Sequence, residues 1–95
     1  MNVRLLTVDF RLGGCRSLKE KRQRLKGLKE KFGRAPNVAV CESDYQDVHQ
    51  RAQWSFIAAA ASGDVAERML AEILQSIELS VDAELIGVVQ ETLLP

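Results

Sequence analysis

The sequence predicts a single α+β domain in which four antiparallel strands form one sheet and two helices cover one of its faces. Two observations lead to this prediction. Segments that alternate apolar and polar residues and segments with helical periodicity follow one another in the order strand, helix, strand, strand, helix, strand. The chain has 95 residues, enough for one hydrophobic core and too few for two. Residues 1–95 are therefore expected to form one ferredoxin-like βαββαβ domain.

The first strand and the first helix are marked by alternation and by a helix cap. Residues 3–12 alternate apolar and polar side chains, as a half-buried strand does, and the Gly13–Gly14 pair ends the strand. Ser17 is a typical helix N-cap, and Glu20 completes the Ser-x-x-Glu capping box three positions later. The leucines that follow recur at helical spacing, and Gly33 marks the end of the helix.

The rest of the chain contains two further strands, a helix and a last strand. Residues 37–44 alternate again, and residues 51–62 do so with Trp54 on the more apolar face. An apolar stripe with a period of about 3.6 residues begins at Asp64 and predicts the second helix, and residues 82–95 give the last strand. Because the helices cover only one face of the sheet, Trp54 is expected to pack in the core rather than to stack on nucleic-acid bases.

The composition excludes several classes of protein. Apolar residues make up 46% of the chain and charged residues 27%, as in an ordinary globular protein. No apolar run is long enough to span a membrane, and the first residues do not resemble a secretory peptide. Cys41 is expected to fill space in a strand and Cys15 to be an exposed loop thiol, since neither belongs to a metal-binding or disulfide pattern. A cytoplasmic protein without a cofactor, a metal site or a membrane segment is predicted.

The charges are distributed unevenly although the chain is formally neutral. Residues 1–34 contain eleven basic and three acidic side chains, and residues 35–95 contain two basic and ten acidic ones. The two parts therefore carry formal charges of +8 and −8. Such asymmetry indicates a polyanion or a charged protein as the partner, and it also permits attraction between copies of the chain.

Most of the basic residues belong to the predicted first helix and its start. Nine of the nineteen residues from Arg16 to Arg34 are Lys or Arg, and only Glu20 and Glu30 are acidic, too few for pairing along the helix. Such a helix either presents an ordinary solvated face or binds the phosphates of a nucleic acid. The residues expected to contact RNA in the second case are Arg16, Lys19, Arg22, Arg24, Lys26, Lys29 and Lys31.

Lys21 differs from the other basic residues because it lies within the apolar sector of the helix. Its side chain is expected either to extend to solvent or to pair with a carboxylate, with Asp44 or Asp47 as the candidates. The turn that follows residue 44 also contains the only histidine, His49, which beside carboxylates can act as a general base or a metal ligand. The alternative is a polar turn that caps backbone groups and in which Arg51 and the two Asp residues anchor the basic helix.

Two motifs resemble those of the YlxP-like (DUF503) family of small bacterial proteins: SLKEKR at residues 17–22 and DYQDVHQRA at residues 44–52. The resemblance covers essentially the whole chain. It implies a ferredoxin-like fold, a bacterial cytoplasmic location and an association with translation, because members are often encoded beside translation and ribosome-maturation factors. It implies no activity, and His49 departs from the pattern because relatives often carry an aromatic residue such as Trp there. The motif residues expected to have a structural or partner-binding role are Lys21, Asp44, Asp47, Gln50 and Arg51.

The sequence thus favours a non-enzymatic accessory protein that binds RNA or a ribosomal particle through its basic helix, with little sequence preference. A homodimeric interaction module is the alternative, because the face of the sheet opposite the helices is semi-apolar. A small enzyme at the turn formed by residues 44–51 is a third reading, although no reaction is indicated. The Gly13–Gly14 turn, with Arg16 before a helix N-terminus, is a further candidate for binding an anion.

Overall fold

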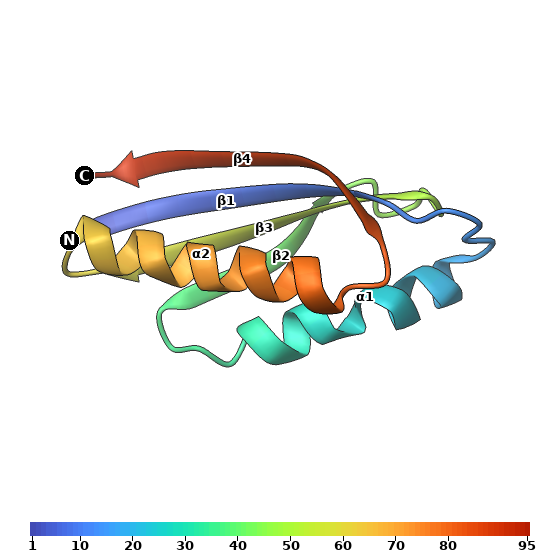
Figure 1. Ribbon diagram of the computed structural model, residues 1–95, viewed down its shortest axis with the longest axis horizontal. Coiled ribbons are helices and arrows are strands. Elements are labelled where there is room, and N and C mark those ends of the chain that lie inside the picture. The colour runs from blue at the N-terminus through green and yellow to red at the C-terminus, as the bar shows by residue number, and fades with distance from the viewer.

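The computed structural model describes residues 1–95. The strands form one antiparallel sheet in the order β2-β3-β1-β4, and both helices lie on the same face of it (Figure 1). This arrangement confirms the predicted ferredoxin-like βαββαβ domain. The elements are, in chain order, β1 (Asn2–Arg11), α1 (Leu18–Phe32), β2 (Val38–Asp44), β3 (Arg51–Ala60), α2 (Gly63–Ser80) and β4 (Glu84–Leu94).

The hydrophobic core lies between the sheet and the helices. The two central strands supply most of its sheet side, because opposed residues of an antiparallel pair share a face. Val8 of β1 lies opposite Trp54 of β3, and Leu6 lies opposite Phe56. All four side chains are buried, and Trp54, which is 9% exposed, packs in the core as predicted.

The two helices cover different parts of the sheet. α1 packs mainly over β2, and α2 packs over β1 and β3. α1 contributes Leu25 and Leu28 to the core, and its last residue, Phe32, meets the ring of Phe56 edge-on with 5.8 Å between the ring centroids. α2 is capped by Ser62, whose hydroxyl accepts a hydrogen bond from the amide of Val65 at 3.3 Å. The buried residues of α2 are Ala66, Leu70, Ile73 and Ile77.

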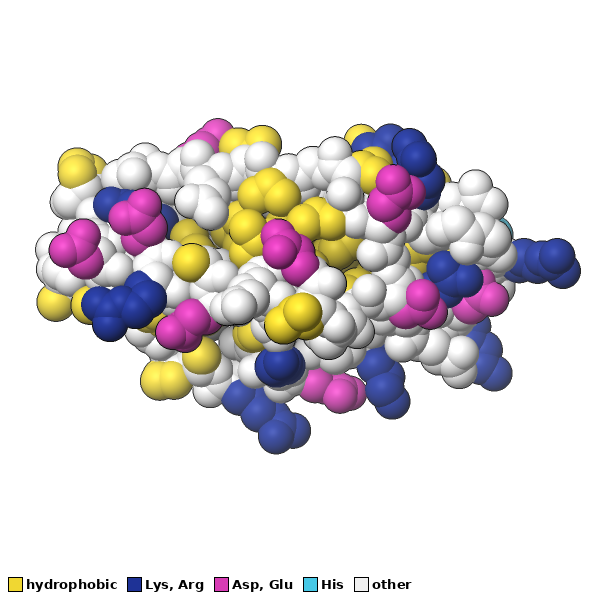
Figure 2. All heavy atoms as spheres, in the orientation of Figure 1, with side chains coloured by type: hydrophobic (Ala, Val, Ile, Leu, Met, Phe, Trp, Pro, Cys, Tyr) yellow, Lys and Arg dark blue, Asp and Glu magenta, His cyan; other side chains and the backbone are white.

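β4 forms one edge of the sheet and is only partly covered. Val88 lies opposite Val8 and therefore on the helix-facing side, yet it is 41% exposed. Figure 2 shows hydrophobic side chains gathered between β4 and α2. β4 and β1 bring the two termini of the chain to the same end of the molecule (Figure 1). Neither helix has the length and apolar character needed to cross a membrane.

Candidate nucleic-acid interface

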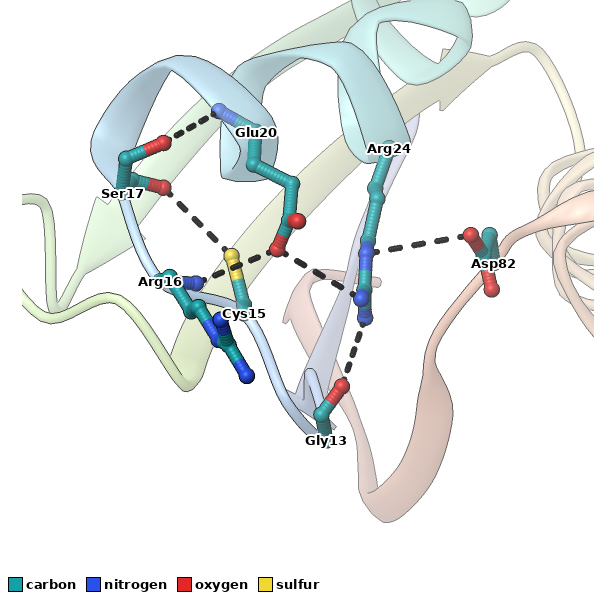
Figure 3. Close-up of polar contacts among 7 residues, drawn as sticks. All are labelled: Gly13, Cys15, Arg16, Ser17, Glu20, Arg24 and Asp82. Atoms are coloured by element: carbon teal, nitrogen blue, oxygen red, sulfur yellow. Dashed lines mark hydrogen bonds and ion pairs between the residues drawn. The ribbon is translucent and has the colours of Figure 1, made fainter.

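The N-terminus of α1 is capped by residues of its own first turn (Figure 3). The hydroxyl of Ser17 accepts a hydrogen bond from the amide of Glu20 at 3.0 Å, as the capping box predicts. The carboxylate of Glu20 in turn accepts a hydrogen bond from the amide of Arg16 at 3.2 Å. A carboxylate of the chain itself therefore complements the positive end of the helix dipole, which argues against an external anion at the Gly13–Gly14 turn.

Cys15 lies beneath this first turn, and the prediction that it is an exposed loop thiol is wrong. Its side chain is 1% exposed, because the turn in which its amide bonds to the carbonyl of Leu12 directs it into the core. Its sulfur donates a hydrogen bond to the carbonyl of Ser17 at 3.4 Å. Burial and the neighbouring carboxylate of Glu20 raise the pKa of the Cys15 thiol. The thiol and the amide of Arg16 hold the pKa of Glu20 below its ordinary value.

Lys21 is held beneath the helix. Its side chain is 4% exposed, and Nζ lies 3.0 Å from the carboxylate of Glu42 and donates a hydrogen bond to the carbonyl of Tyr45 at 2.6 Å. Lys21 thus pairs with a carboxylate, as was predicted, but the partner is Glu42 and the prediction of Asp44 or Asp47 is wrong. Glu42 lies on the helix-facing side of β2, whereas Asp44 follows a shift in register and its Oδ1 accepts a hydrogen bond from the amide of Tyr45 at 2.7 Å.

The flank of α1 that faces α2 uses its basic side chains within the chain (Figure 3). The guanidinium of Arg24 lies 3.5 Å from the carboxylate of Glu20 and 3.8 Å from that of Asp82, and it donates a hydrogen bond to a carbonyl of the preceding turn. Nζ of Lys31 donates a hydrogen bond to the hydroxyl of Ser76 in α2. The structure therefore does not place Arg24 and Lys31 among the free cations of the helix.

The other basic residues of α1 and its flanking turns have no ion-pair partner. Five of the thirteen Lys and Arg side chains pair with a carboxylate, and of the eight that do not, seven lie between Arg16 and Arg34. Figure 2 shows basic side chains projecting along the lower edge of the molecule, where Figure 1 places α1. The side chains of this segment with neither an ion pair nor a hydrogen bond are Arg16, Lys19, Arg22, Lys26, Lys29 and Arg34.

A groove runs between the free flank of α1 and the sheet. Its volume is about 300 Å³. Arg22, Lys26 and Lys29 supply basic groups to its lining, and Leu25 and Trp54 supply the apolar part. The basic flank therefore forms one wall of a shallow, open groove.

Four residues of this groove were not predicted as site residues from the sequence: Leu25, Glu30, Glu42 and Trp54. Glu30 and Glu42 complete the lining. The indole nitrogen of Trp54, Nε1, is itself buried and has no hydrogen-bond partner within the chain. The sequence does indicate that Glu42 faces the helices, because it lies two positions after Val40 and four after Val38 in the alternation of β2. No signal in the sequence identified the indole, because its surroundings come from α1 and β2.

The turn formed by residues 44–51 anchors α1 through its backbone. The carbonyl of Tyr45 accepts the hydrogen bond from Lys21. The guanidinium of Arg51 lies on the opposite face of the sheet, 4.6 Å from the centre of the Tyr45 ring and 4.0 Å from the carboxylate of Asp9. The prediction that Arg51 anchors the basic helix by a salt bridge is therefore wrong, because the strand alternation turns Arg51 away from the helices.

The remaining residues of this turn are exposed. Asp47, His49 and Gln50 line a shallow hollow together with Val48. The backbone carbonyl of Gln50 accepts a hydrogen bond from the amide of Leu12 at 2.9 Å, which ties the turn to the end of β1. No group of three His, Cys, Asp or Glu side chains is arranged to hold a metal ion. The turn thus has the contacts of a structural connection.

The face of the sheet opposite the helices is open and has a polar and an apolar part. In the polar part, the hydroxyl of Ser43 bonds to the side chain of Gln53 at 2.9 Å. In the apolar part, Ile57 is 37% exposed and Val89 is 52% exposed. Cys41 is also exposed on this face, so the prediction that it fills space is wrong, because nothing in the chain covers the strand there.

The sequence and the structure are similar to those of several known proteins. A family model described as "Protein of unknown function (DUF503)" matches residues 3–90. Among solved structures, the chain is similar to "protein YJCS", with a TM-score of 0.59 and 9% identity over 94% of this chain and 96% of that one. It is also similar to a de novo designed protein with a ferredoxin fold, LFR1 1, with a TM-score of 0.57 and 11% identity over 100% of this chain and 87% of the other. At these identities the likeness shows the fold alone. No curated protein matches the chain.

Proposed function

The chain belongs to the DUF503 family, and we propose that it is a non-enzymatic cytoplasmic accessory protein that binds RNA or ribosomal particles through the free flank of α1. The observation that carries the proposal is the distribution of partners around this helix. Basic residues that face α2 are engaged within the chain, whereas Arg22, Lys26 and Lys29 lie together and form no ion pair. The association with translation that the family resemblance implies is consistent with such a partner.

The spacing of these residues gives the proposal an energetic basis. Lys26 lies four positions after Arg22 and three before Lys29, so the three cations are neighbours on the helix surface and repel one another. Each like-charge pair of this kind costs roughly 0.2–0.5 kcal/mol in an isolated helix. Phosphates remove this repulsion, and their condensed counterions are released when Lys and Arg bind. A polyanion is therefore the partner class that suits the flank.

The same geometry sets the kind of binding that is expected. Contacts to phosphates position a protein on a nucleic acid but do not read its sequence. If about four phosphates of a single strand are contacted, the logarithm of the binding constant should fall against the logarithm of the salt concentration with a slope of about −3. Binding should thus be moderate at low salt and nearly absent at high salt.

The test is binding to purified ribosomal subunits and to their RNA across a salt series, comparing the wild type with the double variant Arg22→Glu/Lys29→Glu. The matched control is Arg11→Glu/Arg68→Glu, which changes the net charge equally at two exposed positions away from α1. The proposal expects the first variant to lose binding and the control to retain it. Absence of binding by the wild type at low salt, or equal loss in both variants, would contradict it.

A homodimer formed through the open face of the sheet is a second candidate function. It is supported by the exposed aliphatic side chains Ile57 and Val89 on that face and by the uncovered edge of β4. Because the helices lie on the other side, such a dimer would leave the free flank of α1 accessible. Sedimentation of the wild type over a concentration series tests it, with Val89→Lys expected to be monomeric and Val65→Lys, at an exposed position on α2, expected to dimerise.

A further inference from the structure

We infer that β4 pairs with β4 of a second copy of the chain, antiparallel and edge to edge, so that the two four-stranded sheets become one continuous sheet. This inference rests on the second candidate function, the homodimer, and specifies its contact, which lies at the edge of the sheet and not on its open face. It is independent of RNA binding by α1, because α1 packs over β2 at the opposite edge.

The outer edge of β4 lacks the features that keep edge strands apart. An edge strand presents a row of unpaired N–H and C=O groups, and native proteins protect it with lysines, prolines, short length or a covering helix. β4 has 11 residues, none of them Lys, Arg or Pro, and no element covers its outer side (Figure 1). Its register shifts against β1 lie near its two ends, so residues 87–92 form an uninterrupted stretch. This stretch can accept a further strand.

The side chains of β4 are apolar and exposed on both faces of the sheet. Of the ten large hydrophobic residues that are exposed, five belong to β4. Val88 lies on the helix-facing side and is 41% exposed, and Val89 lies on the open face and is 52% exposed. A strand added at the edge covers both, whereas stacking of two open faces would leave Val88 in water. The edge contact therefore accounts for more of the exposed apolar surface than the face contact does.

β2, the strand at the other edge of the sheet, differs in each of these respects. It has seven residues, it contains the carboxylates of Glu42 and Asp44, and its register against β3 shifts between these two. α1 packs over it, and none of its residues is among the exposed large hydrophobics. Charges, a bulge and a covering element are the usual protection of an edge. Only β4 is therefore suited to pairing.

The uninterrupted stretch of β4 is complementary to itself. Two such strands related by a two-fold axis perpendicular to the sheet place residues of the same face opposite each other. With Val89 opposite Val89 of the second copy, Val88 lies opposite Gln90 and Gly87 lies opposite Glu91. Val88 and Gln90 both lie opposite buried residues of β1, and the other three lie opposite residues of the open face. The one carboxylate of the stretch thus meets a glycine and not a like charge. A second copy is therefore the occupant that fits this edge.

The charges beside this contact are compensated or lie outside it. Asp9 of β1 is next to Gly87, and its carboxylate is 4.0 Å from the guanidinium of Arg51. Glu84 lies before the uninterrupted stretch. Because the two-fold axis is perpendicular to the sheet, the helices of both copies lie on one side of the joined sheet, with α1 of each copy at an outer end. Both basic flanks then face the same side, where one polyanion can contact them.

Two lysine substitutions distinguish the edge contact from the face contact. Val88→Lys introduces a charge on β4 away from the open face, and its matched control Ile57→Lys introduces one on the open face of β3, at 37% exposure. Sedimentation equilibrium over a concentration series measures the dimer. The wild type and Ile57→Lys are expected to dimerise alike. Val88→Lys should raise the Kd of the dimer by about ten-fold or more, because the ammonium group loses hydration at the contact.

Hydrogen exchange reads the pairing of β4 in the wild type, without any substitution. The amides of β4 that point away from β1 lack a partner in the monomer and should exchange more slowly as the protein concentration rises. The amides of β2, the other edge, should exchange at rates that do not depend on concentration. This measurement decides the matter even if Val88→Lys does not fold, which thermal unfolding would reveal.

Several outcomes would overturn the inference. A dimer that Ile57→Lys disrupts and Val88→Lys does not, or that both disrupt equally, would contradict the edge contact, as would concentration-independent exchange in β4 of a dimeric wild type. The first of these would support the face contact instead. A wild type that stays monomeric at all concentrations would refute both forms of the homodimer while leaving RNA binding by α1 unaffected.

Discussion

Apart from the buried Lys21, the basic side chains of α1 have partners within the chain on the side that faces α2 and form no ion pair on the side that faces β2. Arg24 contacts two carboxylates and Lys31 a serine hydroxyl, whereas Arg22, Lys26 and Lys29 line a groove and form no ion pair. The residue types on the two flanks are the same. The role of a basic residue on this helix is therefore decided by the element beside it, and a count of Lys and Arg overstates the surface that is free to bind a partner.

The same comparison explains part of the charge asymmetry between the two parts of the chain. Asp82 follows α2 and belongs to the acidic part, and it contacts Arg24 from the basic part. In this pair, and in that of Lys21 with Glu42, a basic side chain of residues 1–34 contacts an acidic side chain of residues 35–95. The basic side chains of the β2-facing flank that form no such pair are the ones available to an external polyanion.

The largest effect is expected for Lys21, which lies beneath both flanks. Lys21→Ala leaves the partly buried carboxylate of Glu42 and the carbonyl of Tyr45 without their partner, and it should lower the free energy of unfolding by about 2–4 kcal/mol. Urea unfolding followed by circular dichroism measures this. Lys19→Ala is the matched control and should change stability by less than about 0.5 kcal/mol, because Lys19 is exposed and unpaired. Similar losses in both variants would show that the buried pair is not the cause.

A smaller effect should separate the two flanks directly. Arg24→Ala removes contacts to Glu20, Asp82 and a backbone carbonyl and should lower stability by about 1 kcal/mol, since the contacts are partly exposed. Lys26→Ala removes no contact of this kind and should change stability by less than about 0.5 kcal/mol. The RNA affinities should show the reverse order. Equal stability losses would mean that the two flanks do not differ as the contacts indicate.

Gly27 lies on the outer ridge between the two flanks. A Cβ atom at this position would meet nothing within 4 Å, so no packing within the chain requires glycine there. Gly27→Ala should therefore raise the free energy of unfolding by roughly 0.5–1 kcal/mol through helix propensity, as measured by urea unfolding. RNA affinity should be unchanged if the nucleic acid lies in the groove. A loss of affinity would show that it approaches the backbone of the outer ridge instead.

The smallest effect concerns the capped end of α1. The thiol of Cys15 and the amide of Arg16 lower the pKa of Glu20, so its carboxylate stabilises the fold above its unfolded pKa of about 4.3, and this contribution is lost as the pH falls through the lower pKa of the folded state. Wild type should therefore be more stable than Glu20→Gln at neutral pH, and the difference should shrink below about pH 4. Urea unfolding at several pH values measures it. A difference that is independent of pH would exclude this role of the charge.

Much of the fold could be predicted from the sequence because local signals agree with the tertiary structure. The alternation in β1 and β3 follows from one face being buried, and the cap at Ser17 is read from neighbouring residues alone. Lys21 was recognised as unusual for the same reason, because its place on the helix puts it among apolar residues.

The errors arose where contacts come from elements far apart in the sequence. Cys15 was expected to be exposed but is buried, because a turn folds it into the core. Cys41 was expected to fill space but is exposed, because nothing covers the open face of the sheet. Arg24 was predicted to contact RNA, and of its two carboxylate partners only Glu20 is near in the sequence, because Asp82 lies 58 positions later in the chain. The groove itself could not be predicted, since Trp54 and α1 are brought together only by the packing of the sheet on the helix.

The position of α1 over β2 has a consequence for how the molecule opens. α1 and β2 are consecutive in the chain, and β2 is an edge strand, so residues 18–44 can detach as one segment while β3, β1, β4 and α2 keep their contacts with one another. Amide hydrogens of this segment should therefore exchange with solvent by partial opening, before those of β1 and β3, which exchange only when the whole domain unfolds. A partner that contacts both α1 and Trp54 of β3 would instead join this segment to the rest of the domain and slow the exchange of α1 and β2.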